Sequence, residues 1–172
     1  MNKNFYLFLI SSASTLLSIE IFHLAIPLTV LSLGYSAVET SWYTFAFFLP
    51  VLLVKIFLAP HIERQDKKQI LLKSEVLRVI IVLTFLLVLY FIKSNSVIFI
   101  TIPISFLFGI FATITEIAEP SALKNLLQNQ DSASILSKYE IRTRTVQLLA
   151  PTICGVLISF YLLFPYLFVV VD

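Results

Sequence analysis

The stretch SVIFITIPISFLFGIFATIT, residues 96–115, is 20 residues long and contains no charged side chain. At 1.5 Å of rise per residue, a helix of this length crosses the ~30 Å hydrocarbon core of a bilayer. Four other segments have the same character. Together they predict five membrane-crossing helices at about 5–32, 39–61, 70–92, 96–123 and 136–163. Pro165 separates the last helix from a stub, 165–172, that is too short to cross a membrane.

The overall composition agrees with a membrane protein. The chain has 172 residues, of which 59% are hydrophobic and 13% charged, and its mean hydropathy is +0.97. A soluble domain has about 25% charged residues, and a small globule lacks the interior to hide so much apolar surface. We therefore expect a single transmembrane domain over residues 1–172 with an all-α fold, a polytopic membrane helical bundle.

The distribution of lysine and arginine predicts the orientation in the membrane, because cytoplasmic loops carry an excess of these residues. Lys93 stands alone at one set of helix ends, whereas the opposite set, which includes the amino terminus and the 61–70 and 124–138 loops, carries Lys3, Arg64, Lys67, Lys68, Lys73, Lys124 and Lys138. We expect the amino terminus and these two loops to be cytoplasmic. The net charge is only +2, and the basic residues are spread along the chain, so no nucleic-acid partner is expected.

The densest run of charges is LAPHIERQDKKQILLKSEVLR, residues 58–78. Glu75 and Arg78 are three residues apart and so share a helix face. Arg78 lies at least one turn inside an apolar segment, where a basic residue costs about 2.5–3.5 kcal/mol unless it snorkels or pairs. Glu75 is its nearest candidate partner. The residues alone indicate a tight cytoplasmic turn between two helices, whose basic residues anchor it at the interface.

The order of these charges resembles the loop between helices 2 and 3 of the major facilitator superfamily (MFS), in particular its macrolide-efflux and enterobactin-exporter branch. Ala59 stands where the family has a glycine. The resemblance implies a cytoplasmic gating role for Glu63, Arg64, Lys67, Lys68, Glu75 and Arg78. Ala150, Pro151 and Gly155 similarly resemble the family's Gly-Pro-x-x-Gly-Gly stretch in helix 5.

The family has twelve helices in two halves of six. This sequence resembles the amino-terminal half only, with five helices and the start of a sixth, an incomplete six-helix half. The resemblance therefore implies a truncated product or a fragment. Its expected partners are membrane lipid, a small-molecule substrate, and the missing carboxyl-terminal half or another membrane subunit. It also implies a location in the bacterial cytoplasmic membrane.

Two pairs of titratable residues lie inside apolar segments. Glu20 and His23 share one face of the first helix, and Glu116 and Glu119 share one face of the fourth. An acid within a membrane is by default a functional hypothesis, and a buried carboxyl–imidazole pair can hold a proton between its members near neutral pH. All four residues are candidates for proton coupling. A purely structural role, as paired or protonated acids that hold helices together, stays open.

Arg142 and Arg144 open the fifth helix, with Glu140 beside them. Residues two apart point in different directions on a helix, so one arginine can pair inward while the other faces lipid headgroups. The two histidines and one cysteine are far apart in sequence. The sequence also has no nucleotide-binding or nucleophile motif. We therefore predict no metal, no cofactor and no enzymatic activity.

The sequence and its resemblance predict a membrane transporter, a proton-coupled exporter or antiporter of small amphipathic molecules. Two other hypotheses remain. The chain is a small stand-alone membrane protein that binds a partner, or it is a non-functional remnant of a transporter.

Overall fold

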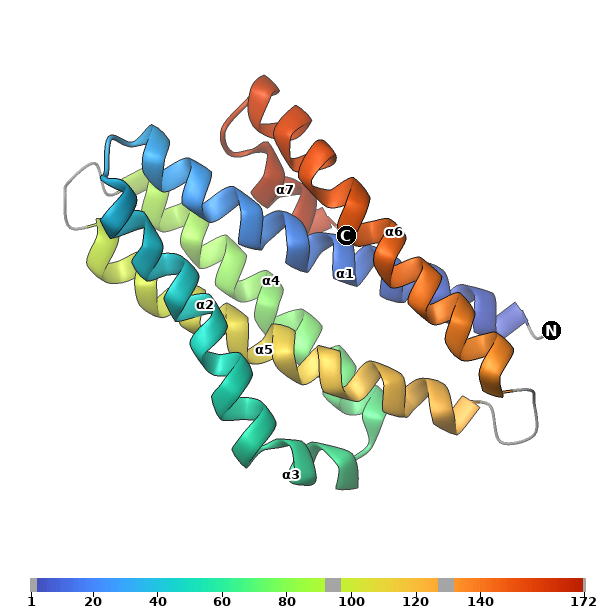
Figure 1. Ribbon diagram of the computed structural model, residues 1–172. Coiled ribbons are helices and arrows are strands. Elements are labelled where there is room, and N and C mark those ends of the chain that lie inside the picture. The colour runs from blue at the N-terminus through green and yellow to red at the C-terminus, as the bar shows by residue number, and fades with distance from the viewer. Residues whose placement is uncertain (1–2, 92–96, 127–131, 172) are drawn as a thin grey trace.

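The computed structural model describes residues 3–91, 97–126 and 132–171, and over these ranges the chain consists of helices joined by short turns, without strands. The predicted all-α bundle is confirmed (Figure 1). The helices are α1 (Lys3–Ser32), α2 (Ala37–Phe57), α3 (Ala59–Arg64), α4 (Lys67–Phe91), α5 (Val97–Leu126), α6 (Ser132–Phe160) and α7 (Phe164–Val171).

Five of these helices, α1, α2, α4, α5 and α6, are long and apolar enough to cross a membrane. Large apolar side chains remain exposed along all five, for example Leu52 on α2 and Leu148 on α6. Exposed apolar surface of this extent is stable only against lipid. The chain is therefore a multi-pass membrane protein, as its composition predicts.

The bounds of the helices differ from the predicted ones mainly after the second crossing. We expected one helix over 39–61, but α2 ends at Phe57 and α3 is a separate short helix that begins at Ala59. Pro60 explains the break, because proline has no N–H to continue a helix but fits its first turn. The predicted stub is helix α7, but the break before it lies at 161–163, and Pro165 is in the first turn of α7 and does not itself separate the two helices. Residues 92, 96 and 172, at the ends of predicted segments, lie outside the described residues.

The core of the bundle is a cluster of aromatic rings. The rings of Phe22 on α1 and Phe108 on α5 stack with their centroids 3.8 Å apart, and Phe85 of α4 and Tyr166 of α7 pack against the same ring of Phe22. A buried hydrogen bond of 2.7 Å between the Thr29 and Tyr166 hydroxyls attaches α7 to α1. The cluster holds α1, α4, α5 and α7 together.

The helices pack in pairs: α2 on α5, α4 on α5, and α1 on both α6 and α7. The closest approach is between α2 and α5 at Gly109, where a Cβ would overlap the backbone oxygen of Phe47 and lie 3.2 Å from Pro50 Cγ. By contrast, α1 meets α5 only briefly, and the backbones of α5 and α6 do not approach each other in the described residues. The bundle consequently opens between α1 and α6 on one side and α2 and α5 on the other (Figure 1).

Candidate functional site

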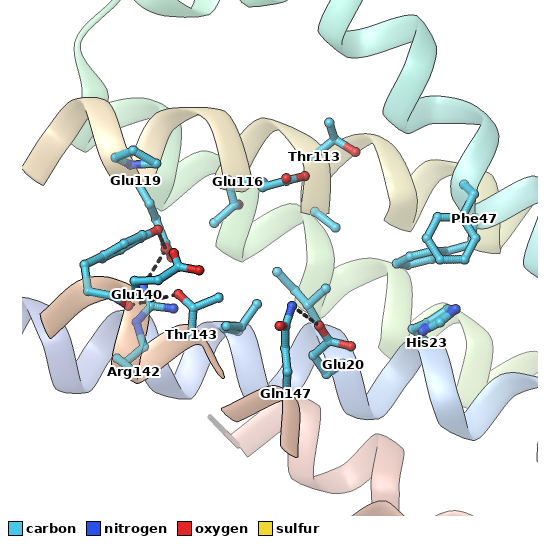
Figure 2. Close-up of a pocket in the computed structure, with 17 residues that line it drawn as sticks. Glu20, His23, Phe47, Thr113, Glu116, Glu119, Glu140, Arg142, Thr143 and Gln147 are labelled. Atoms are coloured by element: carbon cyan, nitrogen blue, oxygen red, sulfur yellow. Dashed lines mark hydrogen bonds and ion pairs between the residues drawn. The ribbon is translucent and has the colours of Figure 1, made fainter. Parts of the chain in front are cut away.

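A cavity of about 560 Å³ occupies the opening between these two helix pairs. All four residues predicted for proton coupling line it: Glu20, His23, Glu116 and Glu119. Figure 2 shows them on two facing helices, with Glu20 and His23 on α1 and Glu116 and Glu119 on α5. The tertiary structure therefore unites two candidate pairs that are 96 positions apart in the sequence.

The best-buried charges of the cavity form an ion pair between α5 and α6. Arg142 Nη2 lies 2.9 Å from Glu119 Oε2, and the two side chains are 9% and 8% exposed. The Tyr139 hydroxyl donates to the same carboxylate oxygen at 3.0 Å, and Arg142 also donates to Ser12 Oγ of α1 at 2.9 Å. The pair thus joins α1, α5 and α6 where the backbones of α5 and α6 lie apart and only their side chains meet.

Two other cavity carboxylates have basic partners that are more exposed. Lys55 Nζ of α2 lies 2.9 Å from Glu116 Oε1, with side-chain exposures of 45% and 60%. Arg144 lies 2.9 Å from Glu140 Oε1 on the same face of α6. The two arginines at the start of the fifth long helix therefore point in different directions, as their spacing predicts: Arg142 pairs inward and Arg144 forms an exposed pair.

Glu20 differs from the other three carboxylates of this cavity. Its only hydrogen-bond partner in the described part of the chain is the side-chain amide of Gln147 on α6, with Nε2 3.5 Å from Oε1. No lysine, arginine or histidine nitrogen lies within ion-pair distance of it there. Figure 2 shows Glu20 and Gln147 facing each other from α1 and α6. Within the described ranges, Glu20 is therefore the acid of this cavity that lacks a cation at ion-pair distance.

His23 lies one helical turn further along α1, against an aromatic wall. Its ring stacks on Phe47 with centroids 4.7 Å apart and meets the edge of Phe48 at 4.9 Å. These contacts fix the plane of the imidazole. The wall also gives the cavity an apolar surface beside its carboxylates, which is the mixture typical of sites for amphipathic small molecules.

The residues predicted to gate the cytoplasmic side are near a second cavity of about 1020 Å³, between α1, the α3–α4 turn, α4 and α5. Glu63, Lys67, Lys68 and Glu75 line it, and Arg64 ends α3. Arg78 pairs with Glu75, as its position within an apolar segment predicts, and Thr15 of α1 donates to Glu75 Oε2 at 3.4 Å. Glu119 lines both cavities, so its ion pair lies between them.

Lys67 has a local structural role that the sequence did not reveal. Its ammonium group is buried and donates to the backbone oxygens of Ile62 at 2.8 Å and Gln65 at 3.0 Å, and also to that of Glu63. These oxygens lie at the carboxyl end of α3, where unpaired carbonyls attract a cation. Lys68, by contrast, is exposed.

The stretch that resembles the family's glycine-rich motif packs only in part. Ala150 is fully buried, whereas Pro151 is exposed and a Cβ at Gly155 would meet nothing within 4 Å. The glycine at which helices do approach closely is Gly109, which the sequence analysis did not single out. A lone glycine within a long apolar helix is its only sequence signal.

Among the described residues, no group of three or more His, Cys, Asp or Glu side chains is arranged to hold a metal ion. Comparisons with protein-family models, with curated proteins and with solved structures give no match.

Sequence reasoning identified the four acid and imidazole groups but missed most of their partners. Lys55, Tyr139 and Gln147 reach the cavity from helices that are distant in sequence. A lysine near the end of an apolar helix reads as an interface anchor, and an isolated glutamine or tyrosine has no distinctive spacing. Only the placement of α2 and α6 beside α1 and α5 gives these residues a common function.

Proposed function

We propose that this protein is a half-unit of a proton-coupled membrane transporter of the MFS type, which exports small amphipathic molecules. One observation carries the proposal. Glu20 faces a cavity at membrane depth and has no basic partner among the described residues.

The depth of Glu20 gives this observation its weight. At 1.5 Å per residue, about 18 Å of helix separate Glu20 from the end of α1 at Ser32 and about 25 Å separate it from the start at Lys3. An ionised carboxylate is costly at such a depth. Its charge must be removed by a proton or balanced by a cationic ligand. A group that alternates between these two states couples proton movement to substrate movement.

The arrangement of the helices supports the family resemblance. In the MFS, each half consists of two three-helix repeats of inverted topology. In such an arrangement α1 corresponds to α5, α2 to α6 and α4 to α7. The packing of α1 on α6 then corresponds to the packing of α5 on α2, and the contact between α4 and α7 corresponds to itself. The packing of α1 on α2 lacks a counterpart between α5 and α6, where the Glu119–Arg142 ion pair connects the helices instead.

The same exchange relates the polar contacts of the cavity. Glu20 on α1 bonds to Gln147 on α6, and Glu116 on α5 bonds to Lys55 on α2. Each contact joins the first helix of one repeat to the second helix of the other. The sequence similarity of residues 20–23 and 116–119, which share a glutamate and an isoleucine, thus has a structural counterpart. This agreement supports a transporter-type duplication.

We also propose that the amino terminus lies in the cytoplasm of a bacterial cell. The start of α1, the end of α5 and the start of α6 lie at one end of the bundle (Figure 1), and this end carries Lys124 and Lys138. A reporter enzyme fused after Lys68 should be active only in the cytoplasm. Activity of a reporter that works only in the periplasm, fused at the same position, would show that the proposed orientation is wrong.

The direct test of coupling is Glu20→Gln in inverted membrane vesicles. The chain is expressed alone and together with the coding sequence that follows it, and transport of the amphipathic dye Hoechst 33342 is driven by an imposed pH gradient. We expect Glu20→Gln to abolish gradient-driven transport, because an amide cannot exchange a proton. Ser159→Ala is the control and should retain it, because Ser159 is exposed on α6 and lines neither cavity. Undiminished transport by Glu20→Gln would reject the coupling role.

The second cavity favours an alternative function, binding of a helix from another membrane protein. Exposed apolar side chains of α1 and α4, including Leu7, Ile10 and Leu72, face a groove wide enough for further side chains. Cysteine cross-linking from position 10 to a co-purified membrane subunit, with no dye transport under any expression, would favour this alternative. Rapid degradation of the chain in every setting would indicate a non-functional remnant.

A further inference from the structure

A third, very small cavity lies between α1, α2 and α5, beyond the aromatic wall of the large one. His23, Tyr43, Thr44 and Ser105 are its polar lining residues. The centre of a water molecule can occupy about 10 Å³ of it, which is close to the minimum of ~10–15 Å³ for one bound water. Most of its lining is apolar, and the polar groups of these four residues are the available partners for such a water.

The Ser105 hydroxyl distinguishes this cavity from an ordinary packing defect. Ser105 is 0% exposed, and its Oγ has no hydrogen-bond partner among the described residues. Buried hydroxyl groups are nearly always hydrogen-bonded to protein or to ordered water. A fully buried hydroxyl that borders a one-water cavity is therefore evidence for a water ligand.

Tyr43 and His23 show where the small cavity lies along the bundle. Thr101 donates to the Tyr43 hydroxyl oxygen at 2.6 Å, so the proton of Tyr43 is available for a further acceptor. Tyr43 is about 9 Å from the start of α2, at 1.5 Å per residue. His23 lines both the small and the large cavity. The small cavity thus lies between the far end of the bundle and the carboxylates of the candidate site.

We propose that the small cavity binds one water molecule through Ser105, and that this water connects Tyr43 to His23 as the outer segment of a proton route to Glu20. The inference rests on the proposed proton-coupled function and assigns the side from which protons reach its site. Ser105 is a positioning residue in this route, because it holds the water and does not itself bind substrate.

The proton transfers along this route balance. The incoming proton binds Tyr43 Oη as the tyrosine's own proton moves to the water, and a proton of the water moves to the free ring nitrogen of His23. His23 then releases a proton to a water of the large cavity, which His23 and Glu20 both line, and this water passes one of its protons to the Glu20 carboxylate, so that every intermediate group regains its initial composition. Glu39, an exposed carboxylate four residues before Tyr43 on α2, lies at the outer end of the route.

The water site can be tested by X-ray hydroxyl-radical footprinting of the full chain in lipid nanodiscs. Radicals formed from a bound water oxidise adjacent side chains even when these are buried. Tyr43 and Tyr166 form a matched pair, since they are 1% and 0% exposed and both are hydrogen-bonded to a threonine, but Tyr166 lines none of the three cavities described above. We expect Tyr43 to be oxidised at least fivefold faster than Tyr166.

Ser105→Val fills the cavity and removes the hydroxyl, and should lower the Tyr43 rate to that of Tyr166. Ser105→Ala removes only the hydroxyl and provides a second, milder variant if Ser105→Val fails to fold. Its Tyr43 rate should fall at least twofold. Ser159→Val is the control, because Ser159 is an exposed serine on α6. Oxidation of Tyr43 no faster than that of Tyr166 in the unsubstituted protein would overturn the water site.

The route is tested by proton uptake into liposomes that contain the full chain and an internal pH-sensitive dye, after acidification of the outside. Ser105→Val should slow uptake at least tenfold and Ser159→Val should not. Equal rates in the unsubstituted protein and Ser105→Val, including no uptake by either, would overturn the route. Ser105-dependent uptake in a protein that fails the Hoechst 33342 assay would reject the proposed function and leave this inference standing. Dye transport without any effect of Ser105 would do the opposite.

Discussion

The Glu119–Arg142 ion pair provides the sharpest test of the structure, because its removal should destabilise the bundle far more than removal of its neighbour. Glu119→Ala leaves the Arg142 guanidinium, which is 9% exposed, with Ser12 as a hydrogen-bond partner and no counter-charge in the pair. Breaking a buried ion pair by removing one partner costs about 3–5 kcal/mol. Tyr139 also loses its acceptor, although this loss belongs to the same network and does not add in full.

The matched control is Glu140→Ala on α6. The Glu140–Arg144 pair has the same N–O distance of 2.9 Å, but its side chains are 54% and 70% exposed. An exposed pair four residues apart contributes about 0.3–0.5 kcal/mol. We therefore expect the loss of stability in Glu119→Ala to exceed that in Glu140→Ala by at least 2 kcal/mol.

The assay is unfolding of the purified protein in mixed micelles with increasing sodium dodecyl sulfate. Fluorescence of Trp42, the single tryptophan of the chain, and far-UV circular dichroism should report coincident transitions. The double variant Glu119→Leu with Arg142→Met should recover most of the lost stability, because an apolar pair of similar volume can replace a buried ion pair. Equal losses for Glu119→Ala and Glu140→Ala would refute the burial of this pair and its role in connecting α5 to α6.

Two further pairs of substitutions test the close packing of α2 on α5 and the capping of α3 by Lys67. Gly109→Ala should destabilise the protein by about 1–3 kcal/mol, because the added Cβ forces α2 away from α5. Gly155→Ala should stabilise it by about 0.5–1 kcal/mol, because alanine has the higher helix propensity and the added Cβ meets no other atom. The same detergent titration measures both, and no change in stability for Gly109→Ala would contradict the close approach of the helices. Lys67→Met should raise the rate of amide hydrogen exchange in α3 at least tenfold, because the carbonyls at the carboxyl end of α3 lose their donor. Lys68→Met should leave this rate unchanged. Equal exchange rates in the two variants would refute the capping role of Lys67.

The sequence predicted those features that depend on neighbours along the chain. Whether a segment can cross the membrane depends on its length and apolar content, and the described residues contain the expected five helices that are long and apolar enough to do so. The pairing of Glu75 with Arg78 and the opposite directions of Arg142 and Arg144 follow from 3.6 residues per turn. These contacts lie within one helix, whose geometry is the same in any bundle.

The candidate site, by contrast, depends on how the helices are rotated and crossed. The partners of Glu20, Glu116 and Glu119 lie 127, 61 and 23 residues away in sequence, and no periodicity relates them. Their distances result from the packing of whole helix faces, such as the close approach at Gly109 and the ring stack of Phe22 on Phe108. Local sequence therefore determined that acids lie within apolar helices. Tertiary packing alone decided which of these acids has a cation beside it, because the two residues must lie at the same depth on helices that turn the right faces toward each other.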